Sequence, residues 1–186
     1  MKRIVLVVWL LCVPQAVLAA DAELVGFFGG YSAGTSIEGV DLENGSLYGL
    51  RFGVSFLRFF GTEIAYTHVG GIEDQLQTFE GTAHDFSWNF LLEYPINKVV
   101  PFATVGLGVL GGTDKAAASI QTGISYNVGG GVKLRKLLGP LGFRFDVRYH
   151  NASKGIRLSA GGDLPSVGTD FDFKFTEVSG AVMLTF

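Results

Sequence analysis

The sequence of 186 residues is poor in cysteine, proline and charge. It has one Cys and 5 Pro, and 17% of its residues are charged, against about 25% in an average soluble protein. A single Cys can form neither a disulfide framework nor a cysteine zinc site within the chain. The formal net charge of -3 excludes a strongly basic surface, so we expect no nucleic-acid partner.

Long apolar runs are also scarce, and the clearest one lies at the start of the chain. A basic pair precedes the apolar run Ile4–Val13, and Val17-Leu18-Ala19 supplies small or tolerated residues before a cut. This order is typical of a secretory signal peptide, and the run is shorter than the roughly 20 residues of a membrane-spanning helix. We predict a signal peptide over residues 1–19, cut after Ala19 or Ala20, and one domain over residues 20–186.

The remaining chain is rich in glycine and aromatic residues and alternates with a period of two. In Tyr48–Phe56, Asp85–Tyr94 and Gly142–His150, every second residue is large and apolar. The intervening residues are mostly Gly, Ser and charged residues. A period of two predicts strands. Because the charged face is also the glycine-rich face, we expect it to line the narrow interior of a barrel, with the aromatic face turned to lipid.

The same alternation predicts an all-β protein with eight strands of about 10 residues, the length that crosses a bilayer when tilted. These strands lie near residues 22–31, 46–57, 60–69, 85–94, 101–110, 123–134, 142–151 and 173–186. Long polar connections are predicted at 32–45, 70–84, 111–122 and 152–172. Short connections are predicted near 58–59, 95–100 and 135–141.

Long and short connections that alternate are typical of an antiparallel up-and-down transmembrane barrel with long extracellular loops and short periplasmic turns. This pattern predicts that both termini of the mature chain are periplasmic. Aromatic residues near the strand ends predict an interfacial girdle that contains Tyr31, Trp88, Tyr94 and Tyr149.

Several stretches resemble the small outer-membrane β-barrel domain family: Asn127–Lys133, Gly142–Arg148, Pro101–Gly108 and the terminal Phe186. The chain is also similar in plan to the outer membrane protein A-type transmembrane domain. This resemblance implies a monomer in the outer membrane of a Gram-negative-type bacterium. Its implied partners are outer-membrane lipid, lipopolysaccharide and the outer-membrane assembly machinery, for which Phe186 resembles the C-terminal signal.

Charged residues on the predicted interior faces are balanced in sign. An eight-stranded barrel has an interior just wide enough for side chains, and buried charges must be paired. We therefore predict a closed lumen filled by an ionic network. Its members are Arg51, Glu63, Glu93, Lys133, Arg144, Asp146, Arg148 and Glu177. The alternative is a gated ion path in which the pairs exchange partners.

His150 and Ser153 raise the alternative of an enzyme. Outer-membrane lipid A deacylases carry a catalytic His and Ser close together on one face of a late strand. Here the two residues are three positions apart, and residues three apart on a strand point to opposite faces. Ala152 stands where the serine is expected. We predict no catalytic residue, and expect His150 at the interface or at the mouth of the lumen.

No cofactor or metal is expected from the remaining motifs. Gly106-x-Gly108-x-x-Gly111 has the letters of a dinucleotide fingerprint, but no βαβ unit surrounds it. His68 and His84 flank the second long connection without a Cys or carboxylate cluster beside them.

The sequence favours an outer-membrane barrel with a structural or surface-interaction role and no enzyme activity. The first alternative is an outer-membrane lipid A acyl hydrolase that uses His150. The second is a soluble secreted ligand-binding barrel. That alternative requires the aromatic faces to turn inward, and Arg51, Arg144 and Arg148 to turn outward.

Overall fold

The computed structural model describes residues 21–34, 36–37, 40–41, 44–56, 58–73, 80–114, 119–158, 166–167 and 173–186. The predicted signal peptide over residues 1–19 lies outside these ranges. Eight long strands build the molecule: β1 (Asp21–Ala33), β4 (Gly45–Phe56), β5 (Phe60–Glu73), β6 (Glu80–Glu93), β7 (Val99–Asp114), β8 (Ser119–Leu138), β9 (Leu141–Leu158) and β11 (Phe173–Thr185). Three short strands lie outside this set: β2 (Ser36–Ile37), β3 (Val40–Asp41) and β10 (Ser166–Val167).

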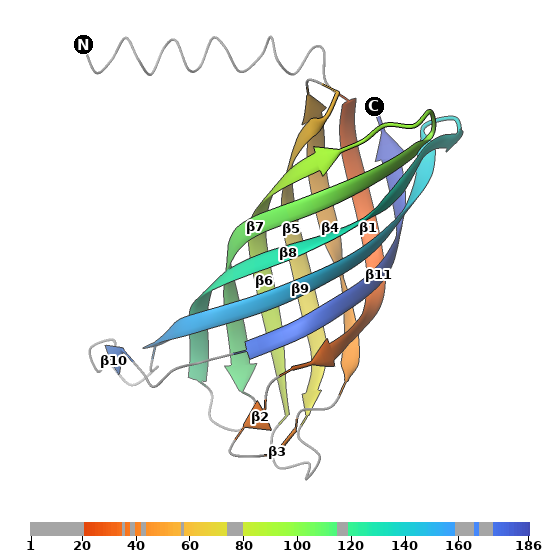
Figure 1. The fold of residues 1–186 in the computed structure, drawn as a ribbon. Coiled ribbons are helices and arrows are strands. Elements are labelled where there is room, and N and C mark those ends of the chain that lie inside the picture. The colour runs from red at the N-terminus through yellow and green to blue at the C-terminus, as the bar shows by residue number, and fades with distance from the viewer. Residues whose placement is uncertain are drawn as a thin grey trace, which may run out of the picture.

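The eight long strands close into an antiparallel barrel (Figure 1). Each strand pairs with its neighbour in the chain, and β11 returns to pair with β1 from Glu23↔Thr185 to Ala33↔Phe175. This last ladder leaves neither of the two strands as an open edge. The predicted all-β, eight-stranded up-and-down barrel is confirmed. Among the described residues, no helix is long and apolar enough to cross a membrane.

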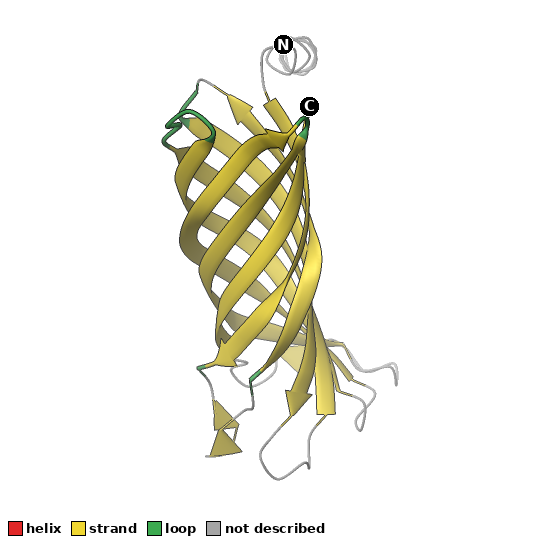
Figure 2. Ribbon diagram, turned by 90° about the vertical axis from the view of Figure 1, so that its right-hand side faces the viewer, coloured by secondary structure: helices red, strands yellow, loops and turns green. Residues whose placement is uncertain are grey.

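The two ends of the barrel differ (Figure 2). At one end, the turn end, short connections join β4 to β5, β6 to β7 and β8 to β9. The end of β11 also lies here, where the Phe186 amide donates to the carbonyl oxygen of Ala22 at 2.9 Å. The other connections leave from the opposite end, the loop end, where β2 and β3 pair as a two-stranded sheet.

The strands extend further toward the loop end than predicted. β5 and β6 pair up to Glu73↔Glu80, and β7 and β8 pair up to Asp114↔Ser119. The long connections predicted at 70–84 and 111–122 are therefore largely wrong. Backbone hydrogen bonds continue an antiparallel ladder whether or not the side chains alternate in polarity. The apolar alternation marked only the central part of each strand.

The connection predicted at 135–141 is also too long. β8 continues to Leu138, where a register irregularity follows Leu134, and the chain turns at Gly139–Pro140. Gly139 has φ +63°, and the turns of tight hairpins favour such positive φ values.

Side chains are sorted by face as the alternation predicts. Large apolar side chains on the outside are between 36% and 70% exposed, and many are aromatic. Arg51, Arg144 and Arg148 point inside and are at most 1% exposed. The soluble alternative needs the reverse arrangement, so the described residues contradict it.

One residue of the predicted girdle is misplaced. Trp88 and Tyr94 lie outside, and Tyr149 is partly exposed, but Tyr31 is only 3% exposed. Its hydroxyl donates to the Gly71 carbonyl at 3.1 Å inside the loop end. The error has a clear cause: β1 carries Phe27 and Phe28 on opposite faces, so hydrophobicity does not define its inner face.

Space inside the barrel is tight enough to require glycine. A Cβ added to Gly131 would lie 1.9 Å from the Phe145 carbonyl oxygen, across the β8–β9 ladder. On the outer face, a Cβ added to Gly26 would meet only a methyl group of Leu50, at 3.8 Å.

We therefore expect Gly131→Ala to lower the free energy of unfolding by about 1–3 kcal/mol, because overpacking shifts the backbone. Gly26→Ala is the matched control and should change it by less than about 0.5 kcal/mol. Urea unfolding of the protein in detergent micelles measures both. Equal effects of the two substitutions would contradict the packing of the interior described here.

Candidate functional site in the barrel interior

All eight residues of the predicted ionic network lie inside the barrel and are at most 2% exposed. Six strands contribute them: β4, β5, β6, β8, β9 and β11. Period-two alternation brings Arg144, Asp146 and Arg148 of β9 to the same inner face. The network separates into two clusters of ion pairs.

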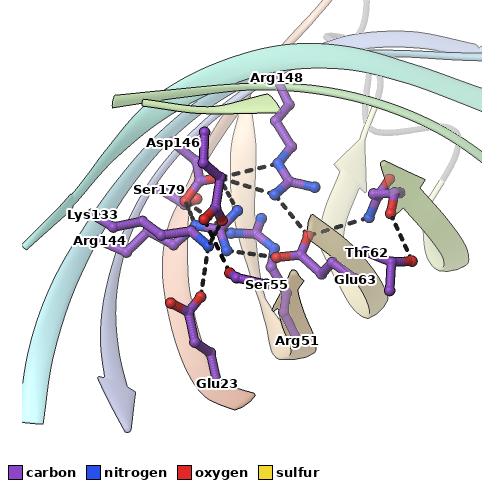
Figure 3. A network of polar contacts seen from close by, with 12 residues as sticks. Glu23, Arg51, Ser55, Thr62, Glu63, Lys133, Arg144, Asp146, Arg148 and Ser179 are labelled. Carbon is purple, nitrogen blue, oxygen red and sulfur yellow. Dashed lines mark hydrogen bonds and ion pairs between the residues drawn. The ribbon is translucent and has the colours of Figure 1, made fainter. Parts of the chain in front are cut away.

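The central cluster joins three arginines to three carboxylates (Figure 3). Asp146 contacts all three arginines. Its carboxylate accepts two hydrogen bonds from Arg144, both at 2.9 Å, and further bonds from Arg148 at 3.0 and 3.1 Å. The Arg51 Nη1 atom lies 3.1 Å from Asp146 Oδ2. A two-pronged contact with a guanidinium group is the strongest form of charge-assisted hydrogen bond.

The other two carboxylates extend this cluster to opposite walls. Glu63 of β5 accepts from Arg144 at 2.5 Å and from Arg148 at 2.9 Å. Glu177 of β11 accepts from Arg51 at 2.5 Å. Glu63 and Glu177 thus bond to arginines from strands other than their own, whereas Asp146 also bonds to two arginines of its own strand, β9.

Aromatic rings cover two of the guanidinium groups. Arg51 lies over the ring of Phe27 at 3.7 Å, and Arg144 lies over the ring of Phe102 at 4.4 Å from the centroid. Such cation–π contacts stabilise a desolvated cation by about 2 kcal/mol or more. They fill the remaining width of the lumen with ring surface.

The second cluster lies toward the turn end and contains two residues that the sequence reasoning missed. Lys133 Nζ lies 2.6 Å from Glu23 Oε2 and 2.5 Å from Glu93 Oε1. Arg135 bridges the same two carboxylates at 2.6 and 2.8 Å. Ser55 completes the cluster by donating to Glu93 Oε2 at 3.0 Å.

The missed residues carried a usable signal. Glu23 alternates with Val25 and Phe27 on β1, and Arg135 continues the alternation of Lys133 on β8. Glu23 lies at the start of a strand, and Arg135 was assigned to a connection. Continuing the period of two by one step beyond Lys133 would have found Arg135, whereas Glu23 needed the inner face of β1 to be known.

Polar residues continue the contacts from the central cluster toward the loop end. Asn89 donates to Glu63 Oε1 at 3.3 Å, and Asn127 donates to Asn89 Oδ1 at 2.8 Å. Ser125 donates to the buried carboxylate of Asp85 at 2.6 Å. Buried apolar side chains occupy the loop end itself: Tyr31, Leu47, Val69, Leu110, Phe173 and Phe175.

His150 lies in the interior, not at the membrane interface. It is 3% exposed, its ring stacks on Phe175 at 4.5 Å, and its Nε2 atom lies 3.1 Å from Glu177 Oε2. Ser179 donates to the other oxygen of Glu177 at 2.6 Å, so this hydroxyl bonds to the carboxylate and not to the imidazole. The side chain of Ser153 is not among those that the structure describes. Phe186 ends the chain on the outer surface and is 70% exposed.

Known structures share the closed eight-stranded fold of this barrel. The fold is that of the small eight-stranded outer-membrane barrels. Neisserial surface protein A is 12% identical, with a TM-score of 0.62 over 90% of this chain and 97% of that chain. No family model matches the sequence, and no curated protein matches it.

Two further structures show the same fold. Ail, the attachment invasion locus protein of Yersinia pestis, is 15% identical, with a TM-score of 0.52 over 90% of this chain and 99% of that chain. The N-terminal β-barrel domain of Pseudomonas aeruginosa OprF is 15% identical, with a TM-score of 0.52 over 89% of this chain and 97% of that chain.

The central cluster predicts a large cost for losing Asp146. Asp146→Asn keeps the shape of the side chain but leaves three buried guanidinium groups with two carboxylates. We expect the free energy of unfolding to fall by about 3–5 kcal/mol, as when one partner of a buried pair is removed.

Asp21→Asn is the matched control, because Asp21 pairs with Lys136 at 3.4 Å and both side chains are about half exposed. We expect its effect to stay below about 1 kcal/mol. Urea unfolding of both variants in micelles makes the comparison. A loss at Asp146 no larger than that at Asp21 would show that the cluster does not stabilise the barrel.

Proposed function

We propose that this chain is an outer-membrane protein with a closed lumen and a structural or surface-interaction role. The observation that carries the proposal is the filled interior. Ion pairs at two levels and an apolar layer at the loop end lie across the path that a solute would follow. A barrel with a filled interior acts through its outer wall or through its loop end.

The outer wall supports placement in a membrane. Aromatic and aliphatic side chains cover it, while its ionic groups are paired inside. Such an apolar outer wall is compatible with the hydrocarbon of a bilayer. Every backbone polar group within hydrocarbon must be paired inside the protein, and a closed barrel pairs them all. Two of the similar structures, a surface protein and an attachment protein, agree with a role at the cell surface.

The alternative of a gated ion path agrees less well with the contacts inside the barrel. Opening the central cluster requires separating carboxylates that each hold two or more donors. Breaking one buried pair costs about 3–5 kcal/mol. Water-filled channels belong to barrels of about 16 strands, whereas eight strands leave room only for side chains.

The deacylase alternative has no specific observation in its favour. A lipid hydrolase needs its base at a surface that an acyl chain can reach. His150 is instead buried, with one face of its ring against Phe175 and its Nε2 atom bonded to Glu177. These contacts give His150 a part in the interior packing.

We expect the protein reconstituted into planar lipid bilayers to show no stable conductance steps at moderate voltage. The ionic clusters hold the lumen closed, so salt concentration should not change this result. The heat-dependent gel shift of the same sample, taken before reconstitution, shows that the barrel is folded. Reproducible unitary conductance from folded protein would overturn the closed lumen.

Orientation in the envelope can be tested with single cysteines, because the sequence has no Cys after Cys12. Asn44 is exposed at the loop end, and Lys98 is exposed in the β6–β7 turn. We expect a membrane-impermeant maleimide to label Asn44→Cys on intact cells. Lys98→Cys should react only after the outer membrane is permeabilised. The opposite pattern would place the loop end in the periplasm.

A further inference from the structure

Two histidines that are distant in the sequence meet on the outer wall of the barrel. His68 of β5 lies directly opposite His84 of β6 in the strand register. Their Nδ1 atoms are 3.4 Å apart, and their ring centroids are 4.8 Å apart. The Tyr66 hydroxyl joins them at 2.8 Å from His84 Nδ1. Three polar atoms therefore converge on one spot.

The site lies at the border of the apolar belt. The outward residues from Phe86 to Leu92 on β6, and Tyr94 just after it, are all large and apolar, and His84 is the next outward residue toward the loop end. A strand rises about 3.4 Å per residue and tilts by about 40°, so the distance from His84 to Tyr94 spans roughly 25 Å of membrane. That span equals the apolar band of such barrels, which puts the histidines at the water interface.

Hydrogen bonding alone leaves this group incompletely satisfied. The Nδ1 atom of His84 carries either one proton or one lone pair, yet it faces both Tyr66 Oη and His68 Nδ1. It can serve only one of them fully. A cation between the rings would use the lone pairs of both nitrogens at once.

The spacing fits a metal ion. Two imidazole nitrogens that bind a tetrahedral zinc ion at about 2.0–2.1 Å lie about 3.4 Å from each other. The two Nδ1 atoms already have this separation, and the Tyr66 oxygen is near enough to contact the ion or a water bound to it. The described residues hold no cluster of three or more His, Cys, Asp or Glu suited to a metal, so the site depends on this pair.

We propose that His68 and His84 form a surface site for a divalent transition-metal ion at the loop-end rim, with Tyr66 beside it. Imidazole nitrogens suit Zn²⁺, Cu²⁺ and Ni²⁺. The bound ion would link β5 to β6 at a position within their ladder, which continues to Glu73 and Glu80. The proposal is independent of the closed lumen, because neither histidine contacts the interior clusters.

The primary test is a calorimetric titration of the untagged mature protein with Zn²⁺ in detergent micelles. We expect one ion per barrel. His68→Gln and His84→Gln should each weaken binding at least tenfold, because one imidazole cannot chelate. Tyr66→Phe, which removes only the hydroxyl, should weaken binding less. All three variants retain His150, which controls for binding by the buried histidine.

Folding of each variant is checked by its heat-dependent gel shift. A second measurement needs no variant: the electron paramagnetic resonance spectrum of the wild-type protein with one equivalent of Cu²⁺ should show two coordinated imidazole nitrogens. Zn²⁺ binding that survives in both glutamine variants, or a Cu²⁺ spectrum with one nitrogen or none, would overturn the site. The histidines would then be a hydrogen-bonded pair in the aromatic girdle.

Discussion

Closure of the hydrogen-bond ladder between β1 and β11 is the constraint on which the rest of the molecule depends. A barrel without an edge satisfies its backbone in hydrocarbon, but closure with eight strands also fixes a narrow interior. Every inward side chain must fit that width. The glycines at crowded positions of β8 and the aromatic rings over Arg51 and Arg144 are two answers to the same shortage of space.

The narrow interior also dictates how charge is handled. An arginine that points inward cannot reach water, so it must find a carboxylate inside the barrel. Several pairs join residues far apart in the chain, such as Arg51 with Glu177 and Lys133 with Glu23, whereas Asp146 also pairs with Arg144 and Arg148 two residues away. Cations and carboxylates are equal in number in each cluster, which removes the largest cost of burying charge. The ion pairs thus connect opposite walls that the backbone ladder leaves unconnected.

Much of this could be predicted because the alternation of residues reports which face a side chain occupies. It located eight strands and the inner face of β9, where Arg144, Asp146 and Arg148 share a period of two. It failed where that signal is absent. The loop-end extensions of β5 to β8 alternate poorly, and both faces of β1 near Phe27 are apolar.

Contacts between side chains of different strands could not be predicted from the sequence either. The pairing of arginines with carboxylates depends on the stagger of the strands and on the length of the side chains. A local residue pattern predicts neither of these. The pairing of His68 with His84 is of the same kind, because it requires the register of β5 against β6. Arg135 differs, since it continues the alternation of Lys133 and lies just beyond the predicted strand 123–134. Glu23 lies within the predicted strand 22–31, but the apolar residues on both faces of β1 hide its inward direction.

The central cluster has a consequence for how the barrel can be assembled. Arg144 and Arg148 sit on β9 near the end of the chain, while their partner Glu63 sits on β5. In a sheet that has not yet closed, Glu63 and these arginines lie on the same face but too far apart to pair, and lipid cannot replace the missing partner. Before closure Arg144 and Arg148 keep Asp146 on their own strand, but Glu63 lacks both of its arginines. We therefore expect the pairing of Glu63 with Arg144 and Arg148 to form together with the closed barrel, and only when the strands have the correct stagger.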